Sequence, residues 1–372
     1  MTTILSNMVS FLKRVKLSKL HLILIILGLF VLLGTISFLY IRQKQTRSLK
    51  GEPRQSQGWG QKPFILSSPA QPPKNKILTY KGFWMPCSFM NDSCQPMNDV
   101  NLLKSMGVNI IGIAPNININ SKGEVKSFPM DYIEKRLNEI TRSYYEAGIR
   151  VFISPSLDFT EDLNSRSGGE PRPIPKEAAA KPGFLDKYDL IIAELAKLAE
   201  KYQVEMFSPM NEPDMQVGLI VASTWGQKIL PVIKQSYKGK VLWKVGRAEP
   251  SSGNIDFKGY DVIGIDFTAP GGSETQSLAG FPQITSKIIN DALTWAKRDG
   301  ISEVILSEVG VWGGAREFSD SGKATLHKII FEQGKGKVKG FIILDPPPDQ
   351  GWSIKNTKSA EEIKTWFTEK LN

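Results

Sequence analysis

The chain has 372 residues, which is enough for one large domain or two small ones. Its formal net charge of +10 at pH 7 is a value that nucleic-acid-binding proteins often show. However, residues 1–62 hold ten basic side chains and a single acid, so the other 310 residues carry only about +1 of this charge. The rest of the chain is almost neutral, which argues against nucleic acid as a partner.

An apolar run rich in Leu and Ile covers residues 20–41, directly after the basic segment 1–19. As a helix, such a run extends about 33 Å, which is sufficient to cross the core of a bilayer. A cleaved signal peptide is the alternative, but its apolar region is usually shorter and ends in small residues. This run ends in Phe38-Leu-Tyr-Ile-Arg42 instead. We therefore expect an uncleaved transmembrane anchor at residues 20–41, with membrane lipid as a partner of its basic flanks.

Residues 42–77 are rich in Gln, Ser, Pro and Gly and poor in aliphatic side chains, as in Ser67-Ser-Pro-Ala-Gln-Pro-Pro73. Such a composition buries too little apolar surface to fold alone, so we expect a disordered linker. The remainder, residues 78–372, is predicted to form one domain.

From residue 78 on, eight apolar or β-branched runs alternate with segments of helical periodicity. The fifth connection is short and has no clear helical pattern. The predicted strands are 80–85, 108–114, 150–155, 204–210, 241–246, 260–267, 303–307 and 338–344. The predicted helices are 98–106, 130–147, 184–202, 223–237, 282–298, 322–332 and 359–370.

Strands that alternate with helices imply parallel pairing through right-handed crossovers. Eight such units in about 295 residues predict a closed (β/α)8 TIM barrel, which typically needs about 250 residues. An open, doubly wound sheet is the alternative, but it usually has a glycine-rich turn after its first strand. Here the first strand leads into Pro86-Cys-Ser-Phe-Met-Asn91, which contains no glycine.

Glu212 and Glu308 lie at or just past the ends of the fourth and seventh predicted strands. The carboxyl ends of the strands form the mouth of a (β/α)8 barrel, where such enzymes have their active sites. Cleavage of a glycosidic bond needs one carboxylic acid and one carboxylate, which these two glutamates would supply from opposite sides. Asn211, directly before Glu212, is suited to a hydrogen bond with a sugar hydroxyl. Taken singly, either glutamate is more often an ordinary surface acid.

Asn211-Glu212-Pro213 and Glu308 resemble the signature of clan A of the glycoside hydrolases, which are retaining (β/α)8 enzymes that act mainly on β-linked glycans. The segment 259–267 is similar to the sixth strand of the endo-β-1,4-galactanases and β-mannanases of this clan. The resemblance implies that Glu212 is the acid/base, that Glu308 is the nucleophile, and that the substrate is a poly- or oligosaccharide. A glycan substrate would also place the domain on the outer side of the cell membrane.

The sequence departs from the clan pattern at several strand ends. Phe267-Thr268 stands where a Tyr usually holds the nucleophile, and Asp266 is the nearest polar group. An Arg that often supports the nucleophile is missing from Ile113-Ala-Pro-Asn116, and the usual tryptophan of the eighth strand is either Trp352 or absent. A non-catalytic, carbohydrate-binding barrel is therefore the alternative function.

Sugar rings have apolar faces, so we expect aromatic and polar side chains at the strand ends to bind the substrate. For Trp84, packing in the core is an equally good interpretation, whereas Trp312 lies four residues past Glu308. The candidate substrate-binding residues are Asn211, Trp312, Trp84, Phe267, Asp266, Trp352 and Asp158.

Cys87 and Cys94 are the only cysteines, and both fall in the first predicted strand-to-helix loop. If the domain faces an oxidising space, we expect them to form a disulfide. With only two histidines, one of them in the apolar run, they cannot fill a zinc shell, so we expect no metal and no other cofactor.

Overall fold

The computed structural model describes residues 68–74, 79–85, 100–119, 124–125, 129–159, 183–246, 250–269, 272–310, 317–344 and 356–371. The predicted anchor and the two cysteines lie outside these residues and stay predictions. Across the described ranges no helix is both long and apolar enough to cross a membrane. The last part of the predicted linker contacts the domain, because the guanidinium groups of Arg142 and Arg150 donate to the carbonyl oxygens of Ser68 and Pro73.

Eight parallel strands close into a barrel, in the order β1-β10-β9-β8-β7-β6-β4-β2. This confirms the predicted closed barrel and excludes the open sheet. The strands are β1 (Tyr80–Met85), β2 (Ile110–Ile113), β4 (Arg150–Ile153), β6 (Met206–Phe207), β7 (Lys240–Val245), β8 (Val262–Thr268), β9 (Glu303–Gly310) and β10 (Gly340–Leu344).

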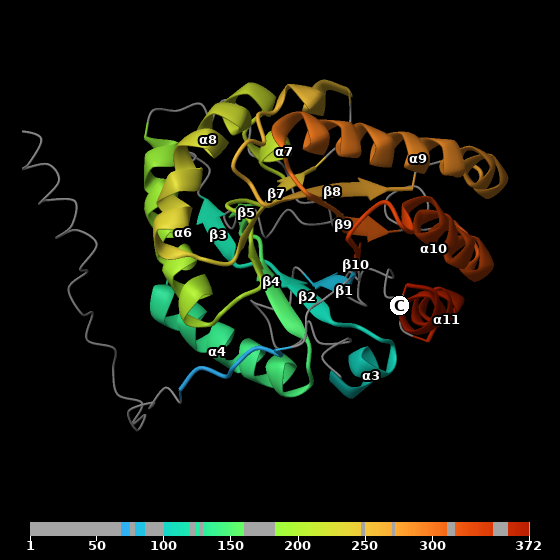
Figure 1. Ribbon diagram of the computed structural model, residues 1–372, viewed down its shortest axis with the longest axis horizontal. Coiled ribbons are helices and arrows are strands. Elements are labelled where there is room, and N and C mark those ends of the chain that lie inside the picture. The colour runs from blue at the N-terminus through green and yellow to red at the C-terminus, as the bar shows by residue number, and fades with distance from the viewer. Residues whose placement is uncertain are drawn as a thin grey trace, which may run out of the picture. The chain divides into compact units, whose positions relative to one another are not determined.

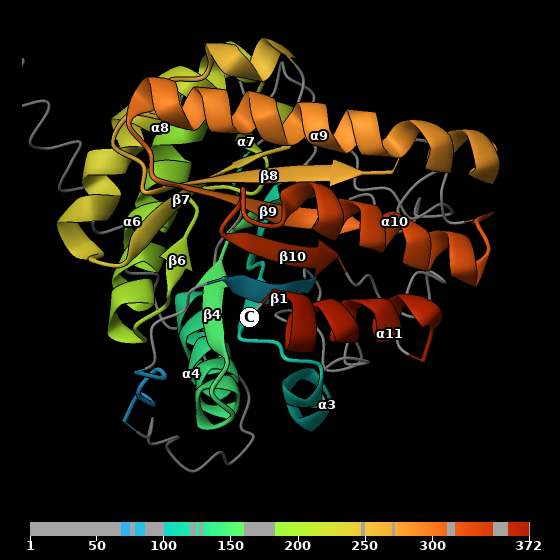
Figure 2. The same ribbon diagram turned by 45° about the vertical axis from the view of Figure 1, so that its right-hand side comes forward.

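Helices surround the strands, as Figure 1 shows, and α9, α10 and α11 lie side by side along β8 and β10 in Figure 2. In the described part of the connection after β7, the one helical element is the short 3-10 helix η2 (Pro250–Asn254), in keeping with the sequence pattern. The other helices are α3 (Val100–Ser105), α4 (Met130–Glu146), α6 (Phe184–Lys201), α7 (Pro213–Gln216), α8 (Leu219–Ser236), α9 (Glu274–Asp299), α10 (Asp320–Gly334), α11 (Lys358–Thr365) and η5 (Trp366–Lys370).

Three helices, α8, α9 and α10, are longer than predicted. The predicted start of α9 at residue 282 is wrong: Pro282 lies inside the helix, which begins after the N-cap Ser273. The Ser273 side chain accepts from the backbone N–H of Gln276, a bond that satisfies one of the free N–H groups at a helix start. α8 begins at Leu219 instead of residue 223, and α10 extends from Asp320 to Gly334.

Alternate residues of each strand point into the barrel or toward the helices. Inward residues such as Trp84, Phe152 and Leu242 form one buried cluster, and the outward residues form a second one with the helices. Gly112 lets Trp84 and Phe152 stack with their ring centroids 5.3 Å apart, because a Cβ at this position would lie 2.3 Å from both rings. The barrel interior is thus a packed core, and its open end alone is available for a site.

Two short strands outside the barrel were not predicted. β3 (Asn116–Ile119) and β5 (Ser156–Phe159) pair in parallel just beyond β2 and β4. A proline, Pro115 or Pro155, separates each from the barrel strand before it, since proline cannot donate to the ladder. The barrel mouth therefore has a raised wall on the side of the second and third barrel strands.

Candidate active site

Glu212 lies beyond the end of β6, at the start of α7. Its backbone has φ 49° and ψ 58°, the left-handed region that residues with a side chain rarely adopt. Such a conformation costs about 1–3 kcal/mol and persists only where the neighbouring structure imposes it. Here the backbone N–H of Asn211 donates to the carbonyl of Pro155 at 2.7 Å, and Pro213 begins α7. The strain indicates that the position of Glu212 is fixed by the structure around it.

Gly246, directly after β7, leaves the space that Glu212 occupies. A Cβ added to Gly246 would lie 2.6 Å from Glu212 Cβ and 2.5 Å from Met215 Cγ, which is closer than such atoms approach. The Gly246 N–H also donates to Asp214 Oδ1 at 3.0 Å and so ties α7 to the end of β7. Together these contacts place the Glu212 side chain beside the end of the fifth barrel strand.

A β-bulge in β9 turns Glu308 toward the barrel interior. Ile265 of β8 pairs with Leu306, but the next residue, Asp266, pairs with Glu308, so Ser307 is an extra residue. Leu306 belongs to the outer core, and strict alternation would place Glu308 on the same outer face. The bulge shifts the alternation by one residue and brings the Glu308 carboxylate into the mouth.

Lys244 of β7 lies at the centre of the site and is fully buried. Its Nζ is 2.6 Å from Asn211 Oδ1, 3.0 Å from Glu308 Oε2 and 3.1 Å from Asp266 Oδ2. The first two contacts are hydrogen bonds, and the third is an ion pair. The remaining side of the ammonium lies over the ring of Trp84, 3.8 Å from its centroid. A buried cation is costly unless it is paired, and here every side of it has a partner.

Asp266 of β8 completes the cluster from the sixth barrel strand. Its side chain is 3% exposed, and besides Lys244 it accepts a hydrogen bond from the hydroxyl of Ser307, the extra residue of the bulge. The bulge therefore brings two groups to the mouth: Glu308, and a hydroxyl that holds the neighbouring carboxylate.

Three carboxyl groups surround one ammonium, and this sets their protonation. Burial, together with the negative charges of Glu308 and Asp266, raises the pKa of Glu212 well above its usual value, and Lys244 opposes this rise. Burial of Asp266 raises its pKa to about 7, with Lys244 again opposing and Glu308 adding to the rise. Because Glu212 and Asp266 interact closely, these two groups titrate as a unit, and the arrangement favours a proton on Glu212 at neutral pH.

The structure brings four of the predicted site residues together: Glu212, Glu308, Asn211 and Asp266. Trp84 is only 1% exposed and lies under Lys244, so it packs in the core, which was the alternative interpretation, and offers no face to a sugar. Phe267 is also buried, and its ring packs against Phe281 of α9 with centroids 6.2 Å apart. Phe267 faces away from the mouth because its neighbour in the strand, Asp266, faces into it.

The other predicted site residues stay predictions. Trp312 and Trp352 lie outside the described residues, as do Cys87 and Cys94. Asp158 belongs to β5, where its backbone pairs with that of Asn118 beyond the third barrel strand.

Sequence reasoning missed Lys244, Gly246 and the Ser307 bulge. A signal for Lys244 was present, because it is the one charged residue within the apolar run Val241-Leu-Trp-Lys-Val-Gly246. A lysine inside a buried strand needs a negative partner, so it indicates a charge cluster. No local sequence pattern predicts the β-bulge at Ser307.

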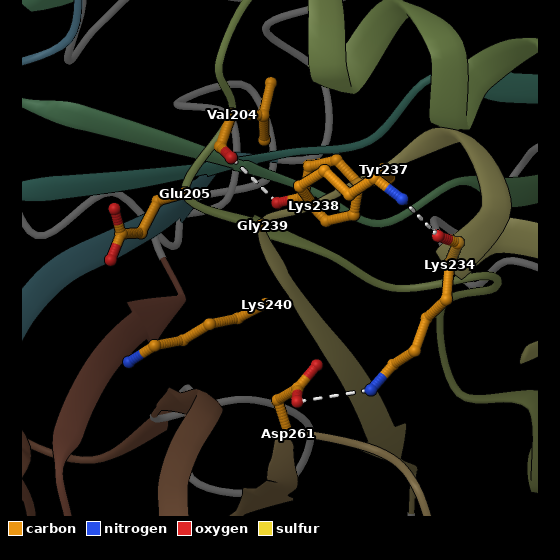
Figure 3. A pocket seen from close by; sticks show the side chains of 8 residues that line it. All are labelled: Val204, Glu205, Lys234, Tyr237, Lys238, Gly239, Lys240 and Asp261. Carbon is orange, nitrogen blue, oxygen red and sulfur yellow. Dashed lines mark hydrogen bonds and ion pairs between the residues drawn. The ribbon is translucent and has the colours of Figure 1, made fainter.

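A cavity of about 410 Å³ lies at the opposite end of the barrel, where the strands begin (Figure 3). Its lysines are already engaged: Lys234 pairs with Asp261 at 3.2 Å, and Lys240 pairs with Glu303 at 2.7 Å. The Lys238 ammonium donates to the carbonyl oxygen of Lys234 at 3.0 Å. We therefore place the candidate site at the other end, around Lys244.

Comparison with known proteins supports the fold. No protein-family model and no curated protein sequence matches the chain. A solved GH113 β-1,4-mannanase matches with a TM-score of 0.58 and 14% identity, over 79% of this chain and 99% of the mannanase chain. The GH113 β-mannanase of Alicyclobacillus acidocaldarius matches with a TM-score of 0.57 and 14% identity, over 78% of this chain and 97% of that one.

A GH5-4 broad-specificity endoglucanase from Clostridium longisporum gives a TM-score of 0.56 at 10% identity, over 78% of this chain and 96% of that one. The GH113 and GH5 proteins are both members of clan A. At this level of identity the matches show the fold alone: this chain is a closed (β/α)8 barrel, as these mannanases and this endoglucanase are.

Proposed function

We propose that this protein is a membrane-anchored, retaining glycoside hydrolase that cleaves a β-linked glycan by double displacement. The observation that carries the proposal is the unequal setting of the two glutamates in one mouth. Lys244 contacts Glu308 directly, whereas burial and nearby negative charge raise the pKa of Glu212. Two carboxyl groups whose environments differ in this way are the pattern of an acid and a nucleophile.

In the first step Glu308 attacks the anomeric carbon, while Glu212 gives its proton to the glycosidic oxygen and the leaving group departs. In the second step Glu212 takes a proton from water, and the resulting hydroxide attacks the same carbon. The bond between the sugar and Glu308 then breaks, and Glu308 regains its carboxylate. The two inversions give a product with the configuration of the substrate.

The membrane part of the proposal depends on the apolar run 20–41 and its basic flanks. The described end of the linker, residues 68–74, reaches Arg142 of α4 and Arg150 at the start of β4. The described residues thus enter the fold at the end where the strands begin.

Hydrolysis of a panel of polysaccharides tests the function. The panel begins with β-1,4-mannan and β-1,4-glucan, since the similar structures are a β-1,4-mannanase and an endoglucanase, and extends to β-1,4-galactan. Proton NMR of the first product formed should show the β-anomer. Binding without hydrolysis of any member would favour the non-catalytic barrel, and the α-anomer as first product would exclude double displacement.

A further inference from the structure

The arrangement around Lys244 assigns a role to a residue that neither the glutamate pair nor the resemblance to clan A points to. We propose that Lys244 is the positioning residue of this site: its ammonium holds the Glu308 carboxylate for attack and turns the Asn211 amide toward the substrate. This inference rests on the proposed glycosidase activity and adds the contact that fixes the positions of Glu308 and Asn211.

The first step of the argument is the direction of the Asn211 amide. An ammonium group donates hydrogen bonds and accepts none, so the atom of Asn211 that lies 2.6 Å from Lys244 Nζ must be the oxygen. The Asn211 NH2 group is then the part left to meet a ligand, and it is a donor. A donor next to the acid/base suits a hydroxyl of the sugar ring at the reacting carbon.

The second step concerns Glu308. Lys244 holds Glu308 Oε2 at 3.0 Å, so the ammonium fixes the direction in which the Glu308 side chain points. A carboxylate fixed through one oxygen has its other oxygen free to attack. The Arg and Tyr that often hold the nucleophile in clan A are missing from the second and sixth strands. Lys244 provides the corresponding contact from the fifth barrel strand.

The third step excludes a nucleophilic role for Lys244 itself. A lysine attacks carbonyl groups only as the neutral amine. Burial would lower the pKa of Lys244, but the charges of Asp266, Glu308 and Glu212 outweigh burial and raise it. Lys244 therefore stays an ammonium ion, which can hold its partners but cannot form a Schiff base at neutral pH.

The test replaces Lys244 with Met, which has a similar length and no charge. The matched control is Lys240→Met, because Lys240 lies on the same face of β7 but pairs with Glu303 at the other end of the barrel. Lys244→Met leaves buried carboxyl groups without their cation, so the double variant Lys244→Met/Asp266→Asn serves if the single variant does not fold. Each is assayed from pH 4 to 9 with 2,4-dinitrophenyl and 4-methoxyphenyl β-glycosides of the sugar that the wild type cleaves.

The expected result is a loss of about 10²- to 10³-fold in kcat/KM, as for removal of one preorganised charge contact in an active site. The loss should be similar for both leaving groups, because Lys244 contacts the nucleophile, and its removal raises the pKa of Glu212 further and so keeps the acid protonated. The pH profile should move to higher pH, because Asp266 and Glu212 lose the positive charge that lowers their pKa values. Lys240→Met should retain wild-type kinetics.

Three outcomes would overturn the inference and leave the proposed function standing. The first is a kcat/KM of the Lys244 variants within about threefold of the wild type. The second is a loss of activity with an unchanged pH profile, which indicates a structural role, and the third is a loss confined to the poor leaving group, which indicates action through Glu212. A wild-type protein that hydrolyses neither the polysaccharides nor the aryl β-glycosides would instead refute the proposed function, and the positioning role with it.

Discussion

Lys240 and Lys244 point from the same face of β7 and each forms an ion pair with a glutamate of β9, Lys240 with Glu303 and Lys244 with Glu308. The two lysines are four residues apart and the two glutamates five, and the bulge at Ser307 accounts for the additional residue. The pairs therefore lie at opposite ends of the barrel interior.

The two ion pairs differ in their surroundings. The Lys240 side chain is 36% exposed, so solvent screens its pair at the end where the strands begin. The Lys244 side chain is fully buried, and charges interact much more strongly there. A Lys–Glu ion pair between β7 and β9 thus lies at each end of the barrel, and only the buried one belongs to the candidate site.

Substitution of Glu308 and substitution of Glu212 should affect activity in different ways. Glu308→Gln removes the nucleophile and should abolish turnover of every glycoside. Glu212→Ala removes the proton donor, so it should be severely impaired on natural glycans but much less so on substrates with a 2,4-dinitrophenyl leaving group. Added azide should restore part of its activity and yield a β-glycosyl azide, detectable by mass spectrometry. If both variants keep wild-type rates, the assignment of these residues is wrong.

Gly246→Ala should lower activity through steric clashes alone, because it adds no charge or polar group. The new methyl group would meet Glu212 and Met215, and a displacement of about 1 Å at a catalytic group can cost about 10²-fold in rate. Overpacking should also lower the free energy of unfolding by about 1–3 kcal/mol. Gly280→Ala in α9 is the control, because no atom lies within 4 Å of its added Cβ. Activity assays and thermal melts of both variants provide the measurement, and equal activity would contradict the tight placement of Glu212.

Much of the barrel could be predicted from the sequence, because the period of the apolar residues sets the alternation of strands and helices. The prediction for β1 has the observed bounds, residues 80–85. Element boundaries were less certain, as at Pro282, which was predicted to begin α9 but lies inside it. β3 and β5 were missed, although the alternation Asn116-Ile-Asn-Ile119 is itself a strand pattern.

The part of the site that lies at strand ends could be predicted, because active sites of (β/α)8 barrels lie there, and this identified Glu212 and Glu308. The prediction that both Asp266 and Phe267 face the substrate was inconsistent, because neighbouring residues of a strand point in opposite directions. Asp266 is the inward residue of this pair. The contacts of Lys244 depend on partners 33 and 64 residues away in the chain, and only the closed barrel brings these together.

Cys87 and Cys94 should form a disulfide in the wild-type protein. Titration of free thiols in the unfolded, unreduced chain should find none. Closure of so short a loop contributes at most about 3 kcal/mol, so reduction should change the thermal midpoint only moderately. Two titratable thiols in protein purified from an oxidising compartment would refute this pairing.

Residues 20–41 should remain in the mature protein as a membrane anchor, with the domain on the outer side. Protease added to intact cells should then remove the domain and leave the anchor in the membrane fraction. Complete protection would reverse the proposed topology. A mature chain that lacks residues 1–41, as determined by N-terminal sequencing, would instead indicate a cleaved signal peptide.

The buried acids should make the free energy of unfolding depend on pH in an unusual direction. Asp266 has a pKa of about 7 in the folded state, against about 3.9 when it is unfolded. Between these values the folded state binds the proton and the unfolded state does not, so stability falls as pH rises from about 4 to 7. The full difference corresponds to a loss on the order of 4 kcal/mol.

Glu212, whose pKa is also raised, should contribute in the same direction. Asp299 and Glu274 have lowered pKa values and act in the opposite sense, with stability lost as pH falls toward their folded pKa values. Their effect cancels when the wild type is compared with Asp266→Asn by urea unfolding at several pH values. The difference in unfolding free energy between variant and wild type should shift in favour of the variant as pH rises from 4 to 8. A difference that is constant over this range would show that Asp266 titrates alike in the folded and unfolded chain, and that Lys244 fully compensates its burial.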